Sequence, residues 1–272
     1  MYNEERALFM AHDILVSNSE FDVGESPLKH SRDVEVSGVT FKGKYPLWYS
    51  NNITVHDTVF EAGARAAIWY TNGLYMHDTK YHAVKSMRRC SGIKLENVEF
   101  TDAHEMLWTC KDISLKNIRV TGGDYLCMNS SDVTVEGLEL KGNYSFDGCS
   151  GIKINNSKII GRDAFWNCEN VTVENCVISG EYIGWNSKNL TFIDCELESL
   201  QGFCYIDGLV MKNCSFKNTT LAFEYSSVDI DINGGIDSII NPIGGIIRTS
   251  SIGELILDPD KVNVKATRIW HK

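Results

Sequence analysis

The fold is decided by one stretch of the chain, residues 152–195, which reads IKINNSKIIGRDAFWNCENVTVENCVISGEYIGWNSKNLTFIDC. The same short pattern occurs three times in it: an apolar residue, a second apolar residue two positions on, and an asparagine or aspartate four positions on. The three copies begin at Ile152, Val171 and Leu190, 19 residues apart. A fixed period near 20 residues is typical of repeat proteins, in which each repeat is one structural unit stacked on its neighbours.

The same pattern extends over most of the chain at intervals of 19 to 21 residues. Its first residues are Ile14, Val34, Ile53, Leu74, Ile93, Ile113, Val133, Ile152, Val171, Leu190, Leu209 and Val228. The fifth position of the pattern holds mostly Asn, Asp or Gly, residue types that tolerate the left-handed backbone conformation, so we expect a tight turn there in every repeat. Recurrent Asn also predicts ladders of side-chain amides between neighbouring repeats.

Short alternating apolar strands separated by turns, without helical periodicity, indicate a β-solenoid. Neighbouring coils of such a fold pair in parallel about 4.8 Å apart, and parallel crossovers are right-handed in nearly all proteins. The sequence therefore predicts an all-β fold, a single-stranded right-handed parallel β-helix of about twelve coils. Leucine-rich and pentapeptide repeats are excluded because their characteristic patterns are missing.

No linker or low-complexity stretch divides the chain, so we expect one domain over residues 1–272. The coils occupy residues 14–232. Residues 1–13 and 233–272 are expected to cap the two ends, because an uncovered end leaves strand edges and core exposed.

The composition limits the classes of partner. A net charge of −10 argues against nucleic acid or an anionic membrane, whose phosphates require clustered Lys and Arg. The sequence has neither a membrane-spanning apolar run nor a signal-peptide layout at residues 1–21, which predicts a cytoplasmic protein.

Seven of the nine cysteines fall into columns of equivalent repeat positions. Cys90 aligns with Cys110, Cys149 aligns with Cys168, and a further column consists of Cys176, Cys195 and Cys214. We interpret them as small core side chains of a reduced protein rather than as disulfides or metal ligands, since no C-x-x-C pair is present. We expect no cofactor and no metal, and the oligomeric state stays open.

Five of the six tryptophans share one column, five residues before the start of each repeat. The column contains Trp48, Trp69, Arg88, Trp108, Met128, Asp147, Trp166, Trp185, Cys204 and Phe223. Adjacent side chains of a strand point to opposite faces, and the preceding column is apolar, so we expect the tryptophans to face outward. Arg88 and Asp147 favour this direction because a charge in a dry core is costly. The alternative is an aromatic ladder within the core.

Charged residues surround the tryptophan column and differ in sign along the chain. Lys44, Arg65, Lys85, Arg88 and Arg89 belong to earlier coils, and Glu105, Asp124, Asp147, Asp163 and Glu181 belong to later ones. Glu105 with Asp124, and Asp163 with Glu181, occupy neighbouring coils at nearly equivalent positions, so their backbones are expected about 5–6 Å apart. Such pairs suit acid–base catalysis, including glycoside hydrolysis. A solvated charged rim is the alternative.

Two resemblances bear on these patterns. A right-handed β-helix with an Asn turn column resembles the pectate-lyase-like superfamily, which implies polysaccharide binding or cleavage along one outer face. The motifs of its polygalacturonases and the calcium cluster of its pectate lyases are missing. Over nearly the whole chain the sequence resembles an uncharacterised bacterial family, domain of unknown function 3737. The shared strings include YPLWYS (45–50), IWYT (68–71), GNYSFD (142–147), DAFWNC (163–168) and GWNS (184–187).

These observations lead to two hypotheses. The first is a protein that binds a saccharide and processes it as a glycoside hydrolase, polysaccharide lyase or sugar epimerase. Trp48, Trp69, Trp108, Trp166, Trp185, Arg88 and Arg89 would bind the ligand, and Asp147, Asp163, Glu181, Glu105 and Asp124 would supply catalytic groups. Flat aromatic faces beside polar groups suit sugar rings. The second hypothesis is a non-catalytic scaffold or protein-interaction module, since a long exposed aromatic strip marks an interaction surface.

Overall fold

The structure is a computed structural model that describes residues 1–22 and 24–272. Its contacts divide the chain into two compact units, residues 1–142 and 143–272. Each unit is described by itself, and the single domain expected from the sequence stays a prediction.

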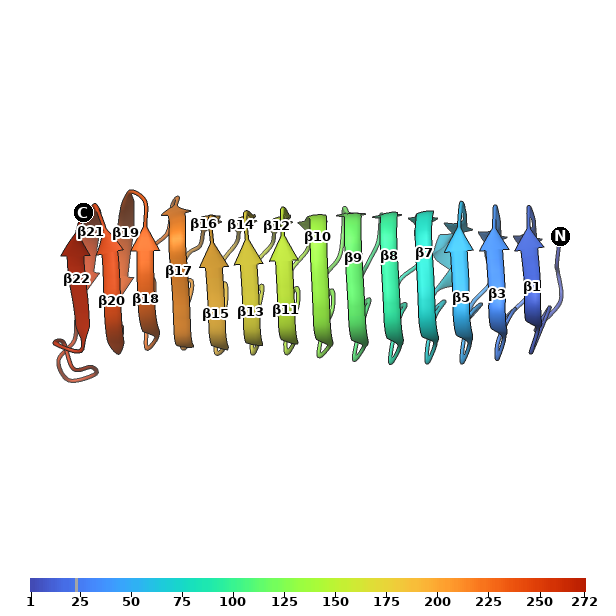
Figure 1. The fold of residues 1–272 in the computed structure, drawn as a ribbon, viewed down its shortest axis with the longest axis horizontal. Coiled ribbons are helices and arrows are strands. Elements are labelled where there is room, and N and C mark those ends of the chain that lie inside the picture. The colour runs from blue at the N-terminus through green and yellow to red at the C-terminus, as the bar shows by residue number, and fades with distance from the viewer. Residues whose placement is uncertain (23) are drawn as a thin grey trace. The chain divides into compact units, whose positions relative to one another are not determined.

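The regular secondary structure of unit 1 is almost entirely parallel strands (Figure 1). They are β1 (His12–Ser17), β2 (Glu20–Phe21), β3 (Arg32–Ser37), β4 (Thr40–Phe41), β5 (Asn51–His56), β6 (Val59–Phe60), β7 (Asn72–Tyr81), β8 (Ser91–Phe100), β9 (Lys111–Val120) and β10 (Ser131–Lys141). Within the described residues the only helical element is the 3-10 turn η1 (Ala62–Ala64).

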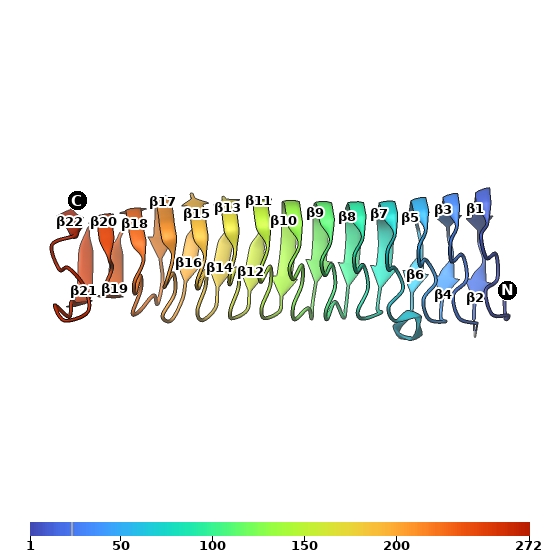
Figure 2. The ribbon, with the colours of Figure 1, turned by 90° about the horizontal axis from the view of Figure 1, so that it is seen from below.

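Unit 2 has the same arrangement of short parallel strands. Several of its coils contain a second, shorter strand, which the view of Figure 2 shows. Its strands are β11 (Ser150–Asn155), β12 (Lys158–Ile160), β13 (Glu169–Glu174), β14 (Val177–Ser179), β15 (Lys188–Ile193), β16 (Glu196–Glu198), β17 (Asp207–Phe216), β18 (Ser227–Ile232), β19 (Gly235–Ile240), β20 (Gly244–Thr249), β21 (Ser251–Ile256) and β22 (Thr267–His271).

The strand register follows the repeat of the sequence. Val34 pairs with Ile14 on one side and with Ile53 on the other, so the first residues of successive repeats are direct partners. In unit 2, Val171 lies in the same way between Ile152 and Leu190. The predicted right-handed parallel β-solenoid is confirmed.

The described residues form about 14 turns rather than the twelve expected. The additional turns come from residues 233–272, in which β20 pairs with β18, β22 pairs with β20, and β21 pairs with β19. At the other end Tyr2 forms a parallel bridge with Phe21. Both segments for which the sequence predicted caps therefore carry the coil-to-coil pairing of the repeats.

The core of each unit is built from stacked columns of like residues. In unit 1 the rings of Phe21, Phe41, Phe60 and Tyr81 stack with centroids 4.5–5.0 Å apart. All nine cysteines are buried, as expected for core positions. Apolar burial of this kind is the main favourable term in folding.

The turn column adopts the predicted left-handed conformation. Asn97 has a φ of 53° and Asn117 a φ of 52° in unit 1, and Asn175 has the same 52° in unit 2. The predicted amide ladder is also present, because Asn117 donates to Asn97 over 3.2 Å and Asn97 donates to Asp78 over 3.1 Å. Where the turn residue is Asn, its side chain can therefore link one repeat to the next, as in these two contacts.

The third segment of each coil, which contains the tryptophan column, is not the regular strand expected from the sequence. Alternate residues have positive φ, as in Lys85 (60°), Met87 (54°) and Arg89 (52°). Backbone hydrogen bonds between coils persist, for example from Arg89 N to Trp108 O over 3.0 Å. The alternation of buried and outward side chains therefore survives only in part, with consequences for the candidate site.

Candidate functional site

The tryptophans of unit 1 lie on the outside of the coils. Trp48, Trp69 and Trp108 are half-buried, whereas the residue before each of them, Leu47, Ile68 or Leu107, is at most 1% exposed. The outward direction expected from the sequence is therefore the one in the structure, and the core ladder is not.

The indole faces in unit 1 are not open to solvent. The rings of Trp48 and Trp69 are parallel within 6°, with centroids 4.9 Å apart, which is the spacing of adjacent strands. Both indole nitrogens donate to backbone carbonyls, Trp48 Nε1 to Ala66 O over 2.5 Å and Trp69 Nε1 to Lys85 O over 2.8 Å. Each of the two rings therefore covers one face of the other. Stacking of a sugar on the faces between them, as expected from the sequence, is therefore not available.

Arg88 continues this column between two tryptophans. Its guanidinium lies 5.3 Å from the ring centroid of Trp69 and 4.2 Å from that of Trp108. Arg88 Nη2 also donates to the carboxylate of Glu105, which Lys85 approaches at 3.4 Å. Arg88 therefore has a structural role between the stacked rings of this column. The carboxylate of Glu105 contacts two cations, Arg88 and Lys85.

A second outward column, which the sequence reasoning missed, lies one residue after the tryptophans. The rings of His30 and Tyr49 stack at 5.1 Å, those of Tyr49 and Tyr70 stack at 4.7 Å, and Arg89 Nη1 donates to the Tyr70 hydroxyl over 3.3 Å. Strand alternation assigns this position to the core. The positive φ values of these four residues, 52° to 62°, turn it outward instead.

The two outer columns of unit 1 together form a cationic aromatic face. Their residues are Phe9, Met10, Lys29, His30, Trp48, Tyr49, Trp69, Tyr70, Arg88, Arg89, Trp108, Thr109, Met128 and Asn129. No carboxylate belongs to either column in this unit. The cations interleave with the rings, since Lys29 Nζ also lies 5.6 Å from the ring centroids of both Trp48 and Tyr49. A cation over an aromatic face is stabilised by the quadrupole of the ring.

The same two columns have the opposite character in unit 2. They contain Asp147, Gly148, Trp166, Asn167, Trp185, Asn186, Cys204, Tyr205, Phe223 and Glu224, without a Lys or Arg. The rings are tilted rather than parallel: Trp166 and Trp185 enclose 32° at 6.0 Å, and Trp185 and Tyr205 enclose 38° at 4.9 Å. The face of unit 2 is therefore acidic and less tightly stacked. Cys204 and Phe223 are fully buried, so these members of the column do not reach it.

The two residues of each predicted carboxylate pair lie on neighbouring coils of one unit and are joined by a backbone hydrogen bond. Glu105 N donates to Asp124 O over 3.0 Å in unit 1, and Asp163 N donates to Glu181 O over 2.8 Å in unit 2. Their environments differ, because Glu181 is exposed whereas Asp163 is buried. The catalytic roles stay predictions.

Asp163 is the one Asp, Glu, Lys or Arg that is buried among the residues described, with 4% exposure. Burial raises the pKa of its carboxyl, while the nearby charge of Arg162 and a hydrogen bond from Tyr144 act against this rise. Arg162 Nε lies 3.7 Å from Asp163 Oδ2. Asp147 also contributes to the raised pKa by charge repulsion, and it accepts a hydrogen bond from Asn167 over 2.9 Å.

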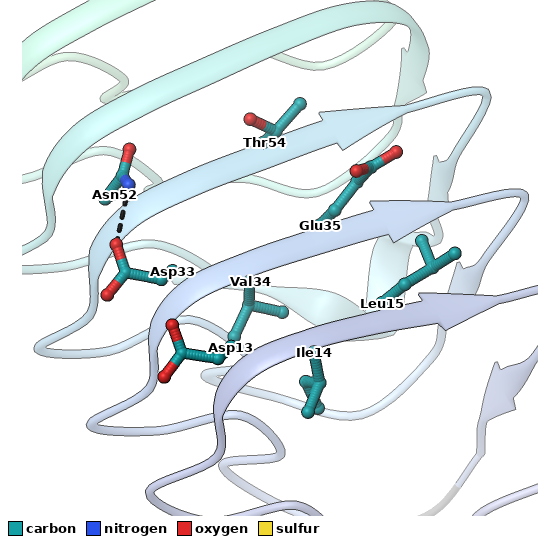
Figure 3. A pocket seen from close by; sticks show the side chains of 8 residues that line it. All are labelled: Asp13, Ile14, Leu15, Asp33, Val34, Glu35, Asn52 and Thr54. Carbon is teal, nitrogen blue, oxygen red and sulfur yellow. Dashed lines mark hydrogen bonds between the residues drawn. The ribbon is translucent and has the colours of Figure 1, made fainter.

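An open hollow of about 310 Å³ lies over β1, β3 and β5 of unit 1 (Figure 3). Asp13, Leu15, Asp33, Glu35 and Asn52 line it, and Asn52 donates to Asp33 over 2.7 Å. The sequence reasoning did not single out this site. Beside it His56 contacts Glu35 (3.1 Å) and Asp57 (2.8 Å).

His56 and His77 stack in one outer column, as the sequence pattern indicates, with centroids 4.9 Å apart. Over residues 1–22 and 24–272, no group of three His, Cys, Asp or Glu side chains is placed to hold a metal ion. In the same residues no helix is long and apolar enough to cross a membrane.

The comparisons with known proteins give one match. A family model described as "Protein of unknown function (DUF3737)" matches residues 1–270. No curated protein and no solved structure matches the sequence.

Proposed function

The chain belongs to the DUF3737 family, whose description names no activity, and from the geometry of unit 1 we propose that its cationic aromatic face binds an acidic saccharide. The observation that carries the proposal is the pair of outer columns in which Lys29, Arg88 and Arg89 lie among tryptophan and tyrosine rings, with no carboxylate in either column. Such a concentration of cations is unexpected in a chain of net charge −10.

The chemistry of the face suits carboxylated sugars. The ring faces are covered by their neighbours, so recognition relies on ring edges, tyrosine hydroxyls and guanidinium groups rather than on stacking. Arg89 is exposed, and a guanidinium binds a carboxylate through two parallel hydrogen bonds. Similar residues recur on successive coils about 4.8 Å apart, so an extended oligosaccharide contacts several of them at once.

The test is a binding measurement with oligosaccharides that differ only in charge. We expect uronic-acid oligomers to bind in calorimetry and their neutral counterparts to bind at least about tenfold more weakly, because charge-assisted hydrogen bonds are the strong ones. Arg89→Ala and Tyr49→Ala are expected to weaken binding. Arg119→Ala is the control, since Arg119 is equally a surface arginine (65% exposed) but lies on β9 outside the two columns.

Two results contradict this proposal. One is the absence of binding for every acidic oligosaccharide. The other is binding that Arg89→Ala and Arg119→Ala weaken equally, which indicates a non-specific charge effect. If acidic peptides bind and saccharides do not, the face belongs to a protein-interaction module, the second hypothesis drawn from the sequence.

We propose separately that unit 2 by itself processes a saccharide, and one observation within that unit favours this role. Asp163 in unit 2 is a buried carboxyl whose pKa is raised by that burial, and a raised carboxyl pKa is the direction that suits a general acid. Glu181 on the next coil is the exposed carboxylate that would act as its counterpart. Turnover of a bound oligosaccharide that Asp163→Asn abolishes without a loss of binding supports this role. Unchanged turnover in that variant removes Asp163 from it.

The proposal also includes a reducing compartment, such as the cytoplasm. Its support is the nine buried cysteines, several of which neighbour one another between coils. Cys90 N, for example, donates to Cys110 Sγ over 3.4 Å. Thiols in such columns are retained where the surroundings keep them reduced. The outer-face ligand and the solenoid fold also agree with the pectate-lyase-like resemblance, which we keep as part of the proposal.

A further inference from the structure

We propose that an aromatic cluster on unit 2, formed by Tyr182, Trp185, Tyr205 and Tyr225 and termed here the unit 2 cluster, binds an organic cation of the alkylammonium type. Trp185 and Tyr205 of this cluster belong to the two outer columns in which unit 1 interleaves its rings with its own cations. It belongs to a different unit from the saccharide face and does not depend on that proposal.

The rings of the unit 2 cluster form a series of tilted neighbours rather than a parallel stack. Tyr182 and Trp185 are nearly perpendicular (81°) with centroids 5.6 Å apart. Trp185 and Tyr205 are tilted by 38° at 4.9 Å, and Tyr205 and Tyr225 by 41° at 5.4 Å. Rings that meet at such angles leave parts of their faces uncovered, as in the aromatic cages that bind quaternary ammonium groups.

The cluster is accessible at its centre. Tyr205 is 39% exposed. Tyr182, Trp185 and Tyr225 are half-buried, so each contributes a fixed ring edge or face. Exposed aromatic side chains with restricted motion provide contact area at a small loss of conformational entropy.

The charge around the cluster is negative and is not neutralised by a cation over the rings. Glu224 directly precedes Tyr225 in the sequence. The pKa of Tyr205 is raised first by burial and then by the negative charge of Glu224. Gln201 Nε2 donates to Glu224 Oε2 over 3.3 Å, which holds the carboxylate at the edge of the cluster. Glu181 precedes Tyr182 and is exposed.

The contrast with unit 1 identifies the missing partner as a cation. In unit 1 Lys29 lies over Trp48 and Tyr49, Arg88 lies over Trp69 and Trp108, and Arg89 lies over Tyr70. Among the described residues no Lys or Arg lies over a ring of the unit 2 cluster. The same repeat positions therefore offer aromatic rings and carboxylates to a cation from outside the chain.

The experiment uses the full chain, choline as the probe cation and 3,3-dimethylbutan-1-ol as its uncharged isostere. Binding is followed by tryptophan fluorescence and by saturation-transfer NMR of the probe methyl groups. We expect saturable binding of choline and at least about tenfold weaker binding of the alcohol, because only the charged probe interacts with the ring quadrupoles and with Glu224.

Three variants locate the site. Tyr205→Ala and Glu224→Gln are each expected to weaken choline binding about tenfold or more. Tyr49→Ala is the matched control. Tyr49 has the same exposure (40%) and the same position in its coil as Tyr205, but its ring is already contacted by Lys29 and by Tyr70. Tyr205 and Tyr49 are both at the surface, so far-UV circular dichroism is expected to show folded variants.

Equal affinity for choline and the alcohol overturns the proposal, because it shows an apolar site without selection for charge. Binding that Tyr205→Ala leaves unchanged overturns it as well. A trimethyllysine peptide tested beside choline distinguishes the two sources of such a cation. Tighter binding of the peptide assigns the cluster to a basic protein segment, and equal binding assigns it to a small free cation.

Discussion

The ladder of unit 1 makes a quantitative prediction for Arg88→Ala. The Arg88 side chain is only 19% exposed and contacts three partners, the rings of Trp69 and Trp108 and the carboxylate of Glu105. Removal of the side chain deletes all three contacts and leaves a gap in an otherwise continuous column.

The loss in free energy of unfolding follows from these contacts. A cation over an aromatic ring contributes about 0.5–1 kcal/mol when exposed and about 2 when desolvated, so the two ring contacts of this mostly buried side chain amount to about 2 kcal/mol. The ion pair with Glu105 adds about 0.5–1 kcal/mol, since Lys85 remains 3.4 Å from the same carboxylate. We expect Arg88→Ala to lower the free energy of unfolding by about 3 kcal/mol.

The assay is urea-induced unfolding, followed by circular dichroism and by tryptophan fluorescence. Arg88→Lys is the informative control, because it keeps the charge but loses the planar group that lies over the rings. We expect it to retain less than half of the stabilisation. A double-mutant cycle with Glu105→Gln is expected to give a coupling of about 0.5–1 kcal/mol for the ion pair.

A loss below about 0.5 kcal/mol, the size of an ordinary surface substitution, refutes this reasoning. It would mean that Arg88 is not part of a structural ladder. Arg88 would then become available to a ligand, and the saccharide proposal would have to include it as a contact residue.

Three further predictions concern the coils themselves. Phe41→Ala removes a fully buried ring and is expected to lower the free energy of unfolding by about 3–5 kcal/mol in the same urea assay; a loss under about 1 kcal/mol contradicts the ring stack as a core element. Hydrogen bonds to Asp57 and then Glu35 raise the pKa of His56 above 6.5, so its stabilisation is present below pH 6.5 and lost as the pH rises through the raised pKa. His56→Gln should flatten this part of the profile of urea midpoint against pH, and an unchanged profile argues against the contact. A Cβ at Gly180 would lie 2.0 Å from a backbone oxygen of the preceding coil, whereas at Gly122 the nearest such atom is 3.5 Å away. Gly180→Ala should therefore lower the thermal midpoint by several degrees and Gly122→Ala should not; equal shifts would contradict the close approach of the coils.

The fold was predictable because a parallel solenoid converts a sequence period directly into spatial neighbours. Val34 and Ile53 are one repeat apart in the sequence and are direct partners in the sheet. The columns of Asn, Cys and Trp were predictable for the same reason. The number of turns was underestimated, since β20 and β22 continue the pairing without the turn residues and apolar spacing of the earlier repeats.

The candidate site was predictable only in part. Membership of the tryptophan column follows from the sequence, which favoured its outward direction over a core ladder. The predicted change of charge sign is present in the two outer columns, although Glu105 and Asp124, assigned to the later acidic coils, lie in unit 1. Arg89 was named from the sequence as a ligand-binding residue, but the column that it shares with His30, Tyr49 and Tyr70 was not predictable, because strand alternation places it in the core. Its outward direction depends on backbone φ values that are positive at non-glycine residues. The residue types alone do not indicate this conformation.

The sequence by itself determined which residues share a column, because in a coil of near-constant length the period alone sets the register. Only the tertiary structure decided which contacts the members of a column make with one another. The rings of Trp48 and Trp69 cover one another in a parallel stack. The rings of Trp185 and Tyr205, which lie in neighbouring outer columns, are tilted by 38°. Arg88 joins two rings, whereas Asp163 is buried between coils. Ring tilt and burial depend on side-chain packing between neighbouring coils, and a one-dimensional period contains no information about either.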